Sequence, residues 1–233
     1  MIPAADHSAP PAFPPLISGR AAATDDPFAE AQALAREGCE AGLVVYRNAP
    51  ERLSAALILA PEVPLADAVA MLPVCGIGVQ NALGALAPPE VAVHLRWSGD
   101  VLVNGARAGR LRIAAPDRNA DACPDWLVVG LDLDFVLPLA APGETPDTTA
   151  LYEEGCGDLE PLPLLEAWLR HTLVWLHRWE TEGNRPIHAE WSGLLSDIPR
   201  DDAAIGLDER FGKLVRDGAT TRLVPLTELL ETP

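Results

Sequence analysis

Lysine is nearly absent from this sequence: Lys213 is the single lysine, and arginine supplies the remaining positive side chains. Acidic residues outnumber Lys plus Arg by 34 to 17, which gives a formal net charge of -17. A surface of this sign repels phosphate backbones and anionic lipid headgroups. We therefore expect neither a nucleic acid nor a membrane surface as a partner.

The sequence also lacks the patterns that mark a zinc site, a signal peptide or a membrane span. No C-x-x-C pair or histidine at ligand spacing accompanies the four cysteines, which are Cys39, Cys75, Cys123 and Cys156. The first twenty residues carry five prolines and neither a basic cluster nor an apolar run, so we expect an extended arm there. No stretch approaches the roughly 20 uninterrupted apolar residues of a span. A cytoplasmic location is the default expectation.

What the sequence does contain is enough apolar material for a folded core. Hydrophobic residues make up 48% of the 233 residues and charged residues 22%, a composition typical of globular domains. The length suits one full-sized domain with a small appendage. We predict a Pro-rich arm over residues 1–26, a main domain over residues 27–187 and a smaller C-terminal domain over residues 188–233.

Local signals place three helices in the main domain. Asp26-Pro27 is an N-cap followed by proline at the first helical position, which predicts a helix over residues 27–37. Residues 65–86 have helical character, and Pro73 should kink or split that helix. A wide apolar stripe predicts a third helix over residues 162–182, which Gly183 ends.

Short apolar runs between these helices predict strands. Asn104-Gly105 is a strong hairpin signal, because both residues tolerate a positive φ. The predicted strands cover residues 43–47, 53–60, 91–97, 101–103, 107–114 and 126–137. We therefore predict an α+β fold in which helices back a mixed, mostly antiparallel sheet. The C-terminal residues carry short strands and turns that suggest a small SH3-like β-barrel.

The two-residue period of a strand sorts charged side chains of the middle region onto common faces. Each of three strands carries a charged pair on one face, and these pairs are His94 with Arg96, Arg110 with Arg112, and Asp132 with Asp134. If the strands are neighbours, one face of the sheet carries a polar patch.

Two interpretations of this patch remain open from the pattern. It can be a solvated face whose cross-strand Arg–Asp pairs contribute about 0.2 to 1 kcal/mol each. It can also be a ligand site, where arginines hold a phosphate or carboxylate and aspartates bind Mg²⁺.

Three consecutive motifs resemble those of a known family. The run V-H-L-R-W-S-G-D-V-L-V-N-G at residues 93–105 is similar to V-x-V-K-W-P-N-D-[IL]-x-x-[ND]-G, and R-A-G-R-L at 107–111 is similar to K-[LV]-[AG]-G-I-L. W-L-V-V-G-L-D-L-D at 126–134 resembles V-[IV]-G-[IA]-G-[IL]-N, and residues 162–191 resemble a closing helix with its trailing tryptophan. These motifs, in this order, are those of the biotin/lipoate A/B protein ligases.

The resemblance implies a ligase that activates biotin, lipoate or octanoate with ATP and passes the acyl group to a lysine on a biotinyl or lipoyl carrier domain. Carried over by motif, the catalytic residues would be Arg96 and Asp100, and Asp132 and Asp134 would hold Mg²⁺. The cofactor-binding residues would be Trp97, Gly109, Arg110 and Arg112. The small C-terminal domain stands where many biotin ligases carry an SH3-like barrel.

Several family positions are altered in this chain. Arg96 replaces the motif lysine and exchanges a compact ammonium for a planar fork. The phosphate loop G-R-G-R-x-G is missing, because residues 47–52 read R-N-A-P-E-R. Ser98 and Gly99 replace Pro and Asn, and Asp134 replaces the later Asn. Two hypotheses follow: a diverged ligase that still activates a carboxylate, and a non-catalytic module that kept the fold and binds a cofactor or a partner.

Cys75 requires separate mention, because octanoyl transferases of the same superfamily use a cysteine nucleophile. Their partner lysine has no counterpart here. We therefore predict that Cys75 is a buried structural thiol.

Overall fold

The computed structural model describes residues 11–137, 147–198 and 204–231. Its main sheet runs in the order β1-β2-β3-β7-β6-β5-β4, with β11 beside β6. The strands are β1 (Ser18–Ala21), β2 (Leu43–Ala49), β3 (Arg52–Leu59), β4 (Val93–Leu95), β5 (Asp100–Val103), β6 (Ala106–Ala114), β7 (Leu127–Asp134) and β11 (Leu230–Glu231). β1 lies parallel to β2 and β11 parallel to β6, whereas the other neighbours are antiparallel. The predicted mixed, mostly antiparallel sheet is confirmed, and part of the predicted arm forms β1.

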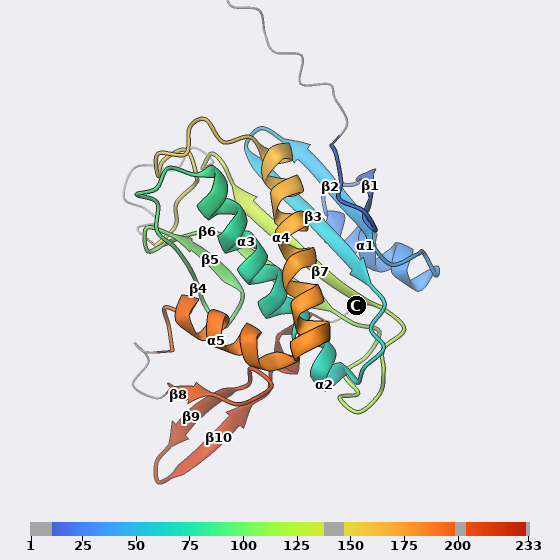
Figure 1. The fold of residues 1–233 in the computed structure, drawn as a ribbon, viewed down its shortest axis with the longest axis vertical. Coiled ribbons are helices and arrows are strands. Elements are labelled where there is room, and N and C mark those ends of the chain that lie inside the picture. Colours follow the sequence, from blue (N-terminus) through green and yellow to red (C-terminus); the bar gives the residue numbers. More distant parts are fainter. Residues whose placement is uncertain (1–10, 138–146, 199–203, 232–233) are drawn as a thin grey trace, which may run out of the picture.

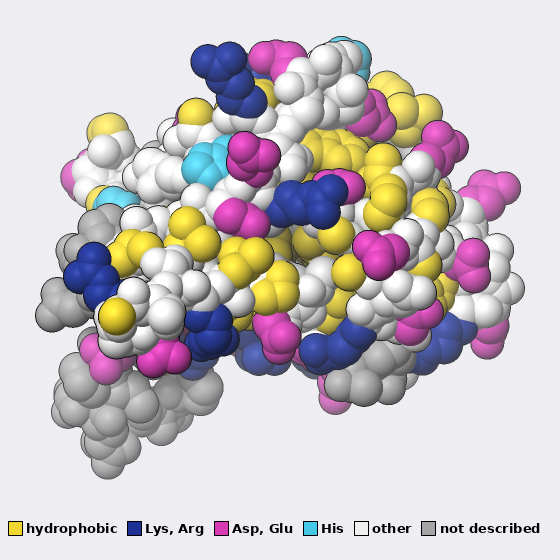
Figure 2. Space-filling view, turned by 90° about the horizontal axis from the view of Figure 1, so that it is seen from below, with side chains coloured by type: hydrophobic (Ala, Val, Ile, Leu, Met, Phe, Trp, Pro, Cys, Tyr) yellow, Lys and Arg dark blue, Asp and Glu magenta, His cyan; other side chains and the backbone are white. Residues whose placement is uncertain are grey.

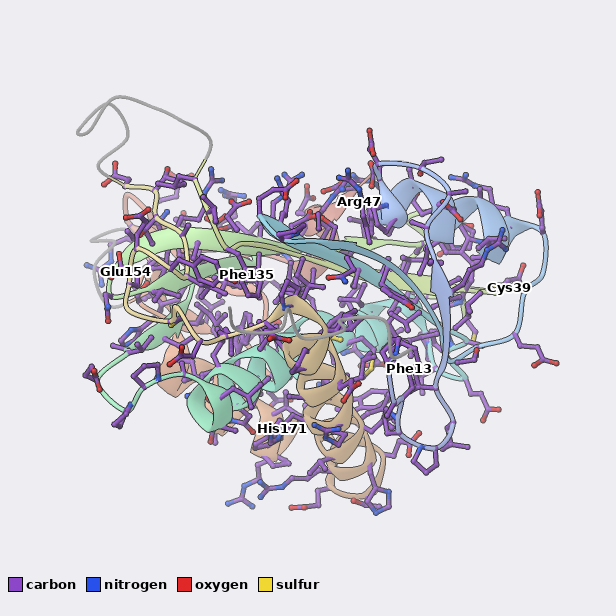
Figure 3. All side chains as sticks on the ribbon, turned by 90° about the horizontal axis from the view of Figure 1, so that it is seen from above. Phe13, Cys39, Arg47, Phe135, Glu154 and His171 are labelled. Carbon is purple, nitrogen blue, oxygen red and sulfur yellow. The ribbon has the colours of Figure 1, made fainter. Side chains whose placement is uncertain are left out.

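Helices cover the two faces of this sheet unequally (Figure 1). One face carries only α1, whereas α3 and α4 lie side by side across the other, as the view along the layers shows (Figure 3). The helices are α1 (Pro27–Arg36), α2 (Leu65–Ala68), α3 (Met71–Leu86), α4 (Pro161–Glu182) and α5 (Asn184–Leu194). The larger core lies beneath α3 and α4, so most of the second face is buried and part of the α1 face is not.

The helix cap and the hairpin turn form at the residues predicted for them from the sequence. The Asp26 carboxylate accepts hydrogen bonds from the backbone N–H groups of Phe28 and Ala29 and so caps α1. Asn104 and Gly105 both take a positive φ between β5 and β6. The predicted break near Pro73 falls slightly earlier, at Val69–Ala70. Pro73 then occupies the first turn of α3, where a missing N–H removes no helical hydrogen bond.

Residues 65–86 are long and apolar enough to cross a membrane by length and composition, the one such stretch in the described part of the chain. Most of this stretch is buried inside the protein. Its apolar character is explained by the packing of α3 against the sheet on one side and against α4 and α5 on others.

Two features of the C-terminal residues bear on the predicted second domain. Helix α5 runs through residue 188, where the sequence places the start of the second domain, and its packing against α3 and α4 leads us to propose a boundary after Leu194. Beyond it, β8 (Ala204–Leu207), β9 (Lys213–Asp217) and β10 (Thr220–Val224) form an antiparallel sheet. Over the described residues this sheet has three strands and does not close into the predicted SH3-like barrel. The short helix η1 (Leu226–Leu229) then leads back to the main sheet.

A groove of about 1430 Å³ lies between the small sheet and the α2–α4 side of the main domain. Hydrophobic side chains line this hollow when the molecule is viewed from below (Figure 2). An ion pair between Arg210 and Asp67, with N and O 2.9 Å apart, spans its rim. None of the site residues predicted from the sequence lines the groove.

The close approach of α3 and α4 generates a prediction about stability. A Cβ added at Gly78 would lie 2.4 Å from Thr172 Oγ1 and 3.1 Å from the Thr172 backbone nitrogen. Gly78→Ala should therefore lower the free energy of unfolding by about 1 to 3 kcal/mol, the usual cost of overpacking. Urea denaturation measures this change.

Gly84→Ala, in the same helix, is the matched control. Its added Cβ would meet only Gln80 Nε2, at 4.0 Å. This variant should keep or raise stability by up to about 1 kcal/mol, because alanine favours a helix over glycine. Equal losses in both variants would contradict the proposed role of Gly78.

Candidate functional site

One row of polar side chains crosses five strands on the α1 side of the sheet. In register, Asp100 of β5 opposes Arg110 of β6, Arg110 opposes Asp132 of β7, Asp132 opposes Ser54 of β3, and Ser54 opposes Arg47 of β2. Directly opposed residues of neighbouring strands point to the same face. Figure 3 shows Arg47 on the same side as α1. The structure thus brings together three residues that the sequence predicted for a site: Asp100, Arg110 and Asp132.

Helix α1 covers only part of this face. The Phe28 ring lies over Gly130, where an added Cβ would come within 2.5 Å of the ring. Beyond that contact the face is open and charged. We define the arginine face as the side chains of Arg47, Arg52, Arg96, Arg107, Arg110, Arg112, Asp100, Asp132 and Asp134. It holds six of the sixteen arginines of the chain.

Asp132 is at the centre of the arginine face. Its carboxylate accepts a hydrogen bond of 2.7 Å from Ser54 Oγ and lies 3.5 Å from Arg52 Nη2 and 3.9 Å from Arg110 Nε. Arg52 also lies 3.5 Å from Asp134. The Ser54 hydrogen bond fixes the position of the Asp132 carboxylate, whereas the two arginines contact it only at long range.

The remaining pairs are also loose. Asp100 lies 3.7 Å from Arg96 and 4.0 Å from Arg107. These two side chains, like those of Arg52 and Arg110, are between 40% and 48% exposed. Long, solvated pairs contribute little to stability. Their guanidinium groups can therefore turn to an external anion at small cost.

Burial raises the pKa of Asp134 above its ordinary value, and the neighbouring Asp132 carboxylate adds to this effect. The guanidinium groups of Arg52 and Arg107 act in the opposite direction. Since burial has the largest effect, the ionised form of Asp134 is less favourable in the folded protein than in water.

Arg112 differs from the other arginines of the face. Its Nε and Nη2 donate to the two carboxylate oxygens of Glu231 at 2.9 and 2.7 Å, and Nη1 lies 3.5 Å from Asp26. Its guanidinium stacks over the Phe28 ring at 4.2 Å. The hydrogen bond with Glu231 raises the pKa of Arg112, and its side chain is only 16% exposed. Arg112 thus links β6 to α1 and β11.

Two of the predicted cofactor-binding residues are set apart from the arginine face. Trp97 is buried, donates from Nε1 to the Phe211 carbonyl oxygen at 2.8 Å, and has the Lys213 ammonium 5.4 Å from its ring. It therefore lies at the junction with the C-terminal residues. Gly109 is buried in β6, where an added Cβ would lie 2.1 Å from the Asp132 carbonyl oxygen. Close approach of β6 and β7 requires a glycine at this position.

The β2–β3 connection is a two-residue turn at Pro50-Glu51. Ala49 and Arg52 form the last pair of the hairpin. The turn leaves no room for a glycine-rich phosphate loop of the kind that the family motif predicts. Arg47 and Arg52 still contribute positive charge beside it.

The described residues contain no group of three or more His, Cys, Asp or Glu side chains that could hold a metal ion. Asp132 and Asp134 share a face, as predicted, and each is within 3.5 Å of Arg52. Mg²⁺ is usually held by one or two carboxylates together with water and the phosphates of a substrate, which these two side chains could provide for in part.

Cys75 lies in α3 with no exposed surface, and burial raises the pKa of its thiol to about 12. A thiol with this pKa carries almost no thiolate at neutral pH. The geometry therefore agrees with the predicted structural thiol.

The sequence analysis did not identify Ser54 or Glu231. Ser54 is the single hydroxyl in β3, a strand that is otherwise apolar after Arg52, and this interruption was the available signal. Glu231 reaches Arg112 from 119 positions away along the chain, which no local pattern indicates.

These features define an α+β protein with a charged, partly open face on its sheet. The sequence profile described as "Biotin/lipoate A/B protein ligase family" matches residues 13–193. The chain belongs to this family. A second profile, a domain of unknown function named DUF4444, matches residues 204–232.

Similar proteins and structures agree with this assignment. A biotin–[acetyl-CoA-carboxylase] ligase of Paracoccus denitrificans is 23% identical over 186 residues, which cover 74% of this chain and 77% of that protein. A biotin protein ligase-like protein of unknown function from Silicibacter sp. TM1040 is 55% identical with a TM-score of 0.89, over 96% of this chain and 100% of the other. Biotin protein ligase from Aquifex aeolicus shares the fold at 17% identity, with a TM-score of 0.67 over 90% and 94% of the two chains.

The central position of Asp132 gives weight to one further departure from the family motif. In V-[IV]-G-[IA]-G-[IL]-N, Gly130 keeps the first glycine, whereas Asp132 stands at the second. The central carboxylate of the arginine face therefore occupies a position where the motif has no side chain.

The raised pKa of Asp134 predicts how the stability of the protein changes with pH. The folded protein holds the proton of the Asp134 carboxyl group more tightly than the unfolded chain does. Stability is therefore lost as the pH rises from the ordinary value of 3.8 through the folded-state pKa. Asp134→Asn removes this loss, so the stability of the variant relative to the unsubstituted protein should rise over that interval. Denaturation at a series of pH values measures it, and a flat or falling difference would contradict it.

Proposed function

We propose that the arginine face binds the carboxylate of biotin, lipoate or octanoate together with a phosphate of ATP, as in a diverged protein ligase. The supporting observation is the gathering of six arginines on one open face of a chain whose net charge is -17. Guanidinium groups are the preferred partners of carboxylates and phosphates. A fold shared with the Aquifex aeolicus enzyme, which has been crystallised with biotin and ATP, agrees with this ligand class.

In the proposed reaction, a carboxylate oxygen attacks the α-phosphorus of ATP and pyrophosphate leaves, which gives an acyl-adenylate. The amine of a carrier-domain lysine then attacks the acyl carbon, an amide bond forms and AMP leaves. Arg96 and Arg110, on either side of Asp100, are placed to stabilise the charge that develops on phosphate oxygens. Asp132 and Asp134 would hold Mg²⁺ with phosphate oxygens as its further ligands.

The same proposal implies an acceptor protein and a cellular location for the reaction. The acceptor would be a biotinyl or lipoyl carrier domain, and we expect the reaction in the cytoplasm. An acidic carrier would be repelled by the overall charge of this chain, so the arginine face is also the favourable place for its approach. The C-terminal sheet stands where family members carry an SH3-like barrel, and we propose that it replaces that barrel.

A second candidate is a non-catalytic module that binds the same ligands without activating them. The two-residue β2–β3 turn favours this candidate, because it removes the backbone cradle that a phosphate requires. Arg96 in place of lysine also favours it, since a planar fork does not reproduce the geometry of an ammonium.

The two candidates differ in turnover. ATP–pyrophosphate exchange should appear with at least one of biotin, lipoate and octanoate if the protein is a ligase, and Arg110→Gln should lower it by about 100-fold. The control is Arg216→Gln on the exposed strand β9, which should leave exchange unchanged. Calorimetric binding of ATP or acid without exchange would establish the second candidate, and absence of both would contradict the arginine face as a ligand site.

Asp132 offers an independent test of the same face. Asp132→Gly restores the motif residue and frees Ser54, Arg52 and Arg110 from the internal carboxylate. The variant should bind the acid, or ATP in the absence of Mg²⁺, about tenfold more tightly, because unpaired guanidinium groups gain more from an external anion. Asp132→Asn distinguishes the effect of the negative charge from that of the side-chain volume, since it removes the charge and keeps the volume. Unchanged affinity in both variants would show that the ligand lies elsewhere.

A further inference from the structure

The last described residues form a strap that returns from the small C-terminal sheet to the main sheet. We define the C-terminal strap as residues 225–231, which include η1 and β11. Leu226 and Leu230 are buried, and Arg118 donates to the Leu230 carbonyl oxygen. The strap thus fastens the C-terminal part to the sheet that carries the arginine face.

Strand β6 pairs with two different strands, β5 and β11, at successive positions along its length. β5 pairs with β6 as far as Arg110, and β11 pairs with it at Ile113 and Ala114. A cavity of about 140 Å³ lies at this change of partner. Arg107 and Arg110 line it on the β6 side, and Glu231 and Leu229 of the strap also line it.

The size of this cavity limits what it admits. Sites for small-molecule ligands have volumes of roughly 300 to 1,000 Å³. The cavity therefore accommodates a single anionic group and is too small for a nucleotide or an acyl-adenylate. Because the strap supplies part of its lining, displacement of the strap would enlarge it.

Glu231 is also the strongest partner of Arg112. Two hydrogen bonds, of 2.9 and 2.7 Å, join them in a bidentate pair. The other arginine pairs of the face are 3.3 to 4.0 Å long. A carboxylate of the strap therefore occupies the donors that a ligand carboxylate or phosphate would use.

We propose that the C-terminal strap is an internal competitor for the arginine face: Glu231 holds Arg112 until an anionic ligand displaces it and releases the strap. This inference rests on the proposed function of the arginine face and assigns the C-terminal part a role in regulating it. Binding of the ligand to the arginine face and docking of the strap on the main sheet then oppose each other. By linkage, whatever weakens docking tightens binding, and ligand binding loosens the strap by the same factor.

The test compares two substitutions in the strap of the full chain. Glu231→Gln weakens the pair with Arg112, whereas Glu228→Gln removes an equal charge from the exposed side of η1 and is the control. Calorimetry with ATP and with inorganic pyrophosphate should show about tenfold tighter binding for Glu231→Gln and unchanged binding for Glu228→Gln. Hydrogen exchange of residues 225–231 should rise when ATP is added to the unsubstituted protein.

The outcomes separate this inference from the proposed function. Equal affinity in all three proteins, or weaker binding by Glu231→Gln, would overturn the competitor role while the arginine face stands. Exchange in the strap that stays constant or falls with ATP would also overturn it. If neither ATP nor pyrophosphate binds any of the three proteins, the arginine face itself is not an anion site and both conclusions fail.

Discussion

The hydrogen bond between Ser54 and Asp132 fixes an anion in the middle of the sheet, and the other charges on that face are arranged around it. A carboxylate that is 15% exposed needs compensation, because leaving water disfavours the charged form. Ser54 supplies a short hydrogen bond, and Arg52 and Arg110 supply opposite charge. The arginines themselves stay about half exposed, so they satisfy Asp132 without being fixed by it.

This distribution of charge is possible because the two faces of the sheet have different roles. Helices α3 and α4 bury the second face, and α3 approaches Leu111 of the sheet closely at Gly76 and Thr172 of α4 at Gly78. The first face is covered by α1 alone, which reaches Gly130 through Phe28. Stability is therefore provided mainly on one side. The other side is free to carry charged groups that contribute little to folding.

Most of the architecture could be predicted from the sequence, because it follows from local signals. The Asp26 cap, the Asn104-Gly105 turn and the stripe of α4 each act within a few residues. The alternation of charged and apolar residues also placed Asp132 and Arg110 on one face. Contacts between distant segments could not be predicted in this way. Glu231 meets Arg112 only after the C-terminal part has folded back, and α5 was missed because Pro186 and Gly193 weaken its helical signal.

The position of Lys213 has a consequence for chemistry near the protein. Acyl-adenylates react with amines, and the ε-amino group of lysine is the usual side-chain amine. Here the single ε-amino group lies over the Trp97 ring, whose indole N–H donates to the Phe211 carbonyl oxygen at the junction with the small sheet. If the proposed acyl-adenylate forms, Lys213 is the one lysine of this chain that a released intermediate can acylate. Mass spectrometry of that residue alone would then report whether the intermediate leaves the arginine face.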